Sequence, residues 1–182
     1  VAGCVVLAPP VFLSEEEASQ VILHELLRSG IEIARTNVEL ASVPVKQGPH
    51  RMVRGDYPEW AAEMKPLEAD GLTADGKVAF EFISEADYFH FRGRDSWWSV
   101  VDYDLVATAR SLAQQVGENG TQVWFGTFYD PMQRDSGRDE PWEVRLRQTH
   151  EDRVAATREE AKRLLREQVV DFVHWLKGQG AI

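Results

Sequence analysis

The period of hydrophobic and polar positions changes along the chain, and each change marks an expected element. From Ser14 to Ser29 apolar residues recur at helical spacing, and Ser14 with Glu17 makes the sequence of a capping box. Gly30 followed by Ile31 is typical of a Schellman stop. The pattern therefore predicts a helix over residues 14–29.

Alternation with a period of two predicts strands over four ranges, which are Ile31 to Val45, Lys77 to Ile83, Tyr88 to Arg92 and Gln122 to Tyr129. The phase slips near Thr36 and Asn37, which indicates a bulge or a tight turn. Pro44 is typical of an edge strand or a strand end. The fourth range is apolar on both faces and is expected to be central in the sheet.

Two further helices and two irregular regions complete the pattern. A helix capped by Ser99 or Asp102 is expected to run to Val116 and to stop at Gly117, and a long one is expected over residues 151–177. Residues 46–76 and 130–150 contain many turn-forming residues and are expected to be irregular, apart from a short helix from Pro58 to Met64.

This order of elements predicts one α+β domain over residues 1–182. The expected architecture is a two-layer sandwich, with a mainly antiparallel or mixed sheet and helices on one side, including the long C-terminal helix. A doubly wound nucleotide-binding fold is disfavoured, because no glycine-rich phosphate motif follows a strand.

Composition narrows the classes of partner. The chain has 182 residues, 43% of them hydrophobic, and a net charge of −10. These values are typical of a globular domain, and no apolar run reaches the length of a membrane span. The negative charge disfavours nucleic acid, and it suits a basic partner, a cation or simple solubility.

The first four residues, Val1-Ala2-Gly3-Cys4, match the end of a bacterial lipoprotein signal. This match predicts lipidation of Cys4, a periplasmic or cell-surface location, and membrane contact only through the lipid anchor. The alternative is that Val1 to Leu7 form a buried strand with Cys4 as an inert core thiol, and that the protein is cytoplasmic. A single cysteine excludes an internal disulfide.

One group of residues has candidate chemistry. If His90 faces outward from its predicted strand, it could act as a general acid or base, with Asp87 or Asp130 to orient it. Aromatic and polar neighbours predict a binding surface made of Tyr88, His90, Arg92, Trp97, Trp98 and Tyr129. The alternative is that these residues pack and pair as ordinary surface and core groups. No motif indicates a metal or another cofactor.

Three classes of function follow, in order of preference. The first is a non-catalytic extracytoplasmic module that binds a protein or small ligand or acts as a scaffold, with the C-terminal helix available for a homo-oligomer. The second is an acidic intracellular inhibitor or immunity-type protein, whose acids between residues 32 and 87 converge on one face to bind a basic partner. The third is a small hydrolase that uses His90.

Overall fold

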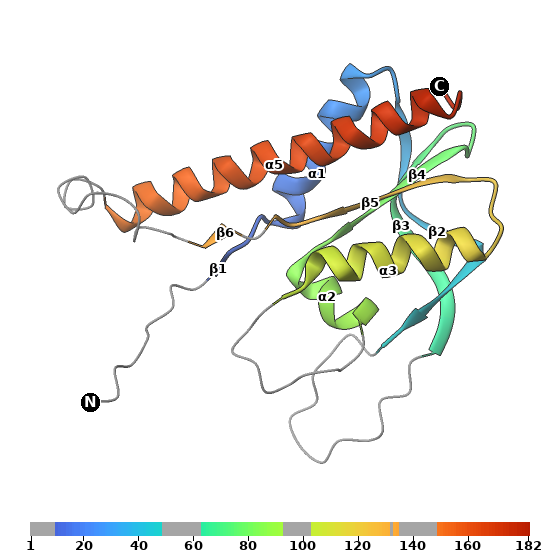
Figure 1. Cartoon of the computed structure of the whole chain (residues 1–182), viewed down its shortest axis with the longest axis horizontal. Helices are drawn as coiled ribbons and strands as arrows, with labels where there is room; N and C mark the ends of the chain where they lie inside the picture. The colour runs from blue at the N-terminus through green and yellow to red at the C-terminus, as the bar shows by residue number, and fades with distance from the viewer. Residues whose placement is uncertain (1–9, 49–62, 93–102, 132, 135–148) are drawn as a thin grey trace, which may run out of the picture.

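The computed structural model describes residues 10–48, 63–92, 103–131, 133–134 and 149–182, and Figure 1 shows how their elements are arranged. The strands are β1 (Pro10–Val11), β2 (Ile33–Gln47), β3 (Glu63–Thr73), β4 (Val78–Ile83), β5 (Trp124–Tyr129) and β6 (Gln133–Arg134). The helices are α1 (Glu15–Arg28), α2 (Glu85–Arg92), α3 (Leu105–Glu118) and α5 (His150–Gly178).

A four-stranded sheet with the order β2-β3-β4-β5 forms the centre of the fold. The neighbours β2, β3 and β4 pair antiparallel, whereas β4 and β5 pair parallel and are connected through α2 and α3. Strands β1 and β6 form a separate two-stranded pair. The expected α+β class, the mixed sheet and the long C-terminal helix are confirmed.

Helices cover both faces of the sheet, so the expectation of two layers with helices on one side is wrong (Figure 1). Helices α1 and α5 pack on one face with Val78, Phe80 and Phe82, and α2 and α3 pack on the other face with Ala79 and Ile83. The physical reason lies in β4, in which every residue is buried. A strand of this kind needs an apolar layer on each side.

Helix α1 confirms the prediction made from its caps. The Ser14 side chain accepts a hydrogen bond from the Glu17 N–H at 3.1 Å, and the Glu17 carboxylate accepts one from the Ser14 N–H. At the other end, Gly30 has a φ of 83°, and the Ile31 N–H donates to the Leu26 carbonyl at 2.9 Å. This is the bond pattern of the expected Schellman stop.

At Thr36 and Asn37, where a slip is expected, β2 keeps one register against β3, and only the positive φ of Asn37 is unusual. The register against β3 shifts between Ile33 and Arg35 and again between Leu40 and Pro44, and Asn37 has a φ of 50°. Pro44 lies in a strand at the end of the described sheet, as its type predicts.

Residues 63–73 form β3, so the prediction of an irregular region over residues 46–76 is wrong for this part. Its first four residues are all exposed and its last three are all buried, so the alternation that identifies a strand is limited to its middle. The expected turn at residues 74–76 is present, with Gly76 at a φ of 71°. Of the predicted helix from Pro58 to Met64, residues 58–62 lie outside the described residues, and Met64 belongs to β3.

Strand β5 lies at the end of the sheet rather than at its centre, where the sequence had placed it. The strand is apolar on both faces because α3 packs on one side and α5 on the other. Helix α3 begins at an Asp104 cap, two residues after the predicted Asp102, and ends at Glu118. In the described ranges, no helix carries a stretch apolar and long enough to span a membrane.

Candidate functional site

Where β3 and β4 separate, two carboxylate side chains accept hydrogen bonds from backbone N–H groups, in place of the backbone carbonyls of a strand pair. The register of this pair runs through Gly71–Phe80 and Leu72–Ala79. At the next position, the Asp70 N–H donates to the Glu81 carboxylate at 3.0 Å, and the Phe82 N–H donates to the Asp70 carboxylate at 2.7 Å. The two acids therefore lie side by side between the strands and are held by backbone donors.

Burial disfavours the charged form of both acids. It raises the pKa of Asp70 to about 6, with smaller contributions from Glu15 and Asp87. It also raises the pKa of Glu81 well above its usual range, and the neighbouring Asp70 is the next cause. Both carboxyl groups therefore keep their protons to a higher pH than exposed acids do, and raised pKa values of this kind are frequent at functional sites.

A third acid reaches this region from the first turn of α1. Burial, together with the charges of Asp87 and Asp130, raises the pKa of Glu15, and the nearby Ser84 side chain acts in the opposite direction. Ser84 itself caps α2, because its hydroxyl oxygen accepts from the Asp87 N–H at 3.3 Å, and its own N–H donates to the Asp87 carboxylate at 3.1 Å. We call Glu15, Asp70, Glu81, Asp87 and Asp130 the carboxylate cluster.

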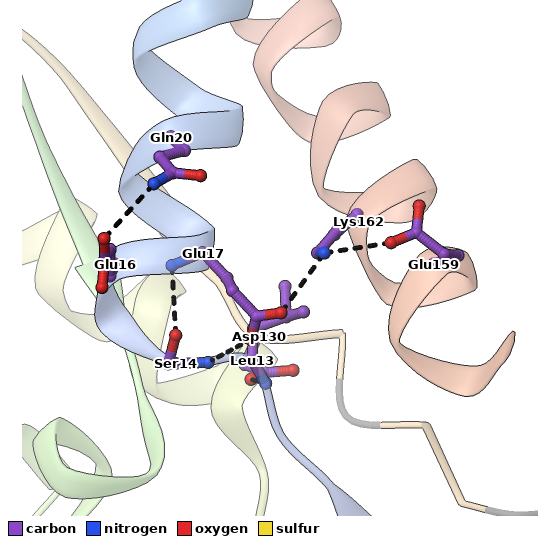
Figure 2. A network of polar contacts seen from close by, with 8 residues as sticks. All are labelled: Leu13, Ser14, Glu16, Glu17, Gln20, Asp130, Glu159 and Lys162. Atoms are coloured by element: carbon purple, nitrogen blue, oxygen red, sulfur yellow. Dashed lines mark hydrogen bonds and ion pairs between the residues drawn. The ribbon is translucent and has the colours of Figure 1, made fainter. Parts of the chain in front are cut away.

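Asp130 fixes the position of α1 relative to the end of β5. Its carboxylate is buried and accepts a hydrogen bond from the Leu13 N–H at 2.6 Å (Figure 2). On the other side of the same helix start, Lys162 of α5 pairs with Glu17 at 3.2 Å and with Glu159 at 3.0 Å. These contacts hold the start of α1, and with it Glu15, against the ends of β4 and β5.

Among the described residues, the charges that raise the pKa values of Glu15, Asp70 and Glu81 are those of other carboxylates. Within the described part of the chain, no three acidic, histidine or cysteine side chains are grouped so that they could hold a metal ion. What the structure provides is a pair, Asp70 with Glu81, and further acids around it.

The predicted surface around His90 differs from the structure, because residues 85–92 form α2 and not a strand. The capping box of Ser84 and Asp87 starts a helix there. The spacing of Phe89 and Phe91 looks like the alternation of a strand, but the segment has only five residues. His90 is therefore buried instead of facing outward, and its Nε2 contacts the Gln47 Oε1 at 3.0 Å. The side chain of Arg92 lies outside the described residues.

The remaining predicted residues separate into three groups. Asp87 and Asp130 lie in the same region, since the charges of both raise the pKa of Glu15. They are therefore neighbours of Glu15 and not the groups that orient His90. Tyr88 packs its ring edge against Tyr103 at 5.2 Å between ring centres, and Tyr129 lies half-buried at the end of β5. Cys4, Trp97 and Trp98 lie outside the described residues.

Sequence reasoning missed the central pair of the cluster. The sequence pattern predicts an irregular region around Asp70 and a strand around Glu81, and it singles out neither acid. A usable signal was present, because Glu81 is the one charged residue of the strand Val78–Ile83. A charge in a strand that is otherwise apolar on both faces indicates a buried ionisable group with a special role.

Comparisons with models of protein families, with curated proteins and with solved structures each find no match.

Proposed function

We propose that this protein is a binding domain whose ligand is a hydrated divalent metal ion, held by Asp70 and Glu81 with Glu15 nearby. The observation that carries the proposal is the use of a half-buried and a buried carboxyl group where neutral amides could accept the same backbone hydrogen bonds. The amide oxygen of an Asn or a Gln could accept the same bonds from the Asp70 and Phe82 N–H groups. Only a carboxylate supplies negative charge, and its ionisation in this place costs stability.

A cation would offset that cost. Mg²⁺ keeps several of its water ligands and is commonly bound through one or two carboxylates, so a pair of acids suits it without a third protein ligand. The side chain of Asp70 is half-buried, whereas that of Glu81 is almost completely buried. We therefore expect Asp70 to contact the incoming ion first and Glu81 to lose its proton when the ion is bound.

The experiment is a thermal unfolding series at pH 7.5 with Mg²⁺, Mn²⁺ or Ca²⁺, compared with NaCl at equal ionic strength. A ligand at a hundred times its Kd stabilises by about 2.7 kcal/mol, which raises Tm by roughly 5–10 °C for a domain of this size. The variants Asp70→Asn and Glu81→Gln should lose this increase. Glu39→Gln should keep it, because Glu39 is an exposed acid of β2.

Two results would contradict the proposal. One is a wild-type Tm that responds to divalent cations no more than to NaCl. The other is an equal response of the wild type, Asp70→Asn and Glu39→Gln, which would indicate general screening of the net charge of −10. Circular dichroism of each variant shows that a lost response does not come from unfolding.

The extracytoplasmic setting is a separate part of this proposal, and it is supported by Val1-Ala2-Gly3-Cys4 alone. An intact mass of the native protein with a diacyl or triacyl adduct on Cys4 would establish it. An unmodified chain with an upstream extension in place of an anchor would contradict it.

The second candidate, an acidic inhibitor that binds a basic partner, draws support from the convergence of Asp70, Glu81 and Asp87. The burial of Glu81 favours a compact cation over a protein surface, and for this reason we place the metal ion first.

A further inference from the structure

We infer that the edge of β5 is an interface between two copies of this chain, which pair antiparallel around Gly126. This inference is independent of the carboxylate cluster. Three observations support it. They are the backbone groups on the outer side of β5, the absence of charge on this strand, and the contrast with β2, the opposite edge strand, which is protected against pairing.

The direction of the backbone groups in β5 follows from its two ends. The Trp124 N–H donates to the Lys77 carbonyl at 2.7 Å, and the Asp130 N–H donates to the Ile83 carbonyl at 3.1 Å, so both point toward β4. Alternate residues of a strand point their backbone groups in opposite directions. Phe125, Thr127 and Tyr129 therefore direct theirs away from the sheet.

One of these three residues already has a substitute for a neighbouring strand. The side-chain amide of Gln168 in α5 accepts from the Tyr129 N–H and donates to the Tyr129 carbonyl, each at 3.0 Å. For Phe125 and Thr127, no strand of the described residues pairs on this side of β5. Among the described residues, the backbone groups of Phe125 and Thr127 therefore form an edge that a further strand can join.

The opposite edge of the sheet is protected in several ways, and the contrast is informative. Strand β2 contains Pro44 and two register shifts, and side chains of α3 form hydrogen bonds with its outer backbone groups. The Lys46 N–H donates to Gln115 at 2.8 Å, and Asn119 donates to the Pro44 carbonyl at 2.8 Å. Proline, bulges and coverage are the devices that prevent edge-to-edge pairing. Strand β5 has the sequence WFGTFY and contains no proline, charge or register shift.

A second copy is the partner that fits this edge. Two copies that each carry a net charge of −10 repel each other least where the facing surfaces carry no charge, and β5 is the one strand of the four-stranded sheet without a charged residue. A twofold axis through Gly126 would pair Phe125 of each copy with Thr127 of the other, so each residue would exchange both backbone bonds.

An aromatic surface beside this edge supports the same interface. Trp175 of α5 stacks on Phe172 at 5.8 Å between ring centres and meets the edge of Trp124 at 5.4 Å. Its side chain is nevertheless 44% exposed. Half-exposed aromatic side chains beside a pairing strand are typical of the anchors of protein interfaces.

Hydrogen exchange by NMR at two protein concentrations tests this inference. The amides of Phe125 and Thr127 should become protected as the concentration rises, together with a mass of twice 20.6 kDa by light scattering. The amides of Gly126 and Phe128 point toward β4 and are internal controls, which should be protected at every concentration. Thr127→Pro removes an outward N–H and should yield a monomer, whereas Leu27→Lys, at an exposed position of α1, should not.

Three results would overturn the inference. The first is a monomer whose Phe125 and Thr127 amides exchange rapidly at all concentrations. The second is a dimer in which these amides stay unprotected, because its interface would then lie elsewhere. The third is a dimer that persists in a folded Thr127→Pro variant. Since the exchange measurement uses the wild-type chain, it decides the question even where that variant fails to fold.

Discussion

Replacing Asp70 by Asn should make the protein more stable above neutral pH, which is the reverse of what the loss of a buried hydrogen-bonding residue usually does. The amide oxygen of an Asn can still accept the bond that the Phe82 N–H donates at 2.7 Å. The change therefore removes the negative charge and keeps the contact. It also relieves Glu81 and Glu15 of a neighbouring carboxylate.

The size of the effect follows from the pKa. Burial raises the pKa of Asp70 from 3.8 to about 6 in the folded state. A shift of about two units corresponds to roughly 3 kcal/mol, at about 1.4 kcal/mol for each unit. Since the Asp70 side chain is half-buried, solvent screening makes this figure an upper limit.

The sign is set by which state holds the proton more tightly. A raised folded-state pKa favours the folded protein while Asp70 is protonated, and this contribution is lost as the pH rises through about 6. The free energy of unfolding of the wild type should therefore fall between pH 4 and pH 7.5, by up to about 3 kcal/mol from this group. In Asp70→Asn this part of the decrease should be absent.

Urea unfolding followed by tryptophan fluorescence, with EDTA present, measures this difference at pH 4.5, 6.0, 7.5 and 8.5. We expect Asp70→Asn to gain on the wild type as the pH rises, and Glu39→Gln to follow the wild type throughout. Parallel pH profiles for the wild type and Asp70→Asn would refute the reasoning. They would mean that Asp70 titrates like an ordinary surface acid.

Two further predictions concern the core. Gly71→Ala should destabilise by about 1–3 kcal/mol in urea unfolding, because the added Cβ would overlap the Phe80 ring, whereas Gly117→Ala in α3 meets nothing within 4 Å and should stabilise by up to about 1 kcal/mol. Leu165→Ala should cost about 2–5 kcal/mol, because Leu165 is fully buried where α5 meets the sheet, and Val170→Ala, at an exposed position of the same helix, should cost under about 1 kcal/mol. Equal losses within either pair would contradict the packing that we describe.

Elements that carry their own end signals could be predicted from the sequence. Helix α1 has its capping box at Ser14 and its Schellman glycine at Gly30, and both form as expected. Helix α5 was predicted within one residue at each end, because its apolar stripe is long and regular. In these places local chemistry and tertiary packing favour the same structure.

Elements whose identity depends on distant partners could not be predicted. Strand β5 is apolar on both faces whether it lies at the centre of the sheet or at an edge covered by two helices, so its sequence does not distinguish these positions. Strand β3 pairs with β2 across Pro66 and Pro44, and neither proline predicts this pairing. The five residues from Tyr88 to Arg92 are too few to separate a period of two from a helical period.

The candidate site could not be predicted either, because it also depends on residues that are distant in the sequence. Glu15, Asp70 and Glu81 are far apart in the sequence, and they meet because α1 begins where β4 and β5 end. Only the spatial order of the strands places Asp70 beside Glu81. The sequence pattern assigns Asp87 or Asp130 to His90 as its partner, whereas in the fold both acids lie near Glu15 and His90 contacts Gln47.

The start of α1 and the start of α2 both lie at the carboxylate cluster, and helix N-termini favour negative charge. Each such end contributes about 0.3–1 kcal/mol. Ionising Asp70 alone costs up to about 3 kcal/mol, and Glu15 and Glu81 add to that cost. The two helix ends are therefore too weak to balance the cluster when its acids are ionised. Bound protons and a bound cation are two ways to provide that balance at neutral pH, and the comparison of Mg²⁺ with NaCl at pH 7.5 tests for the cation.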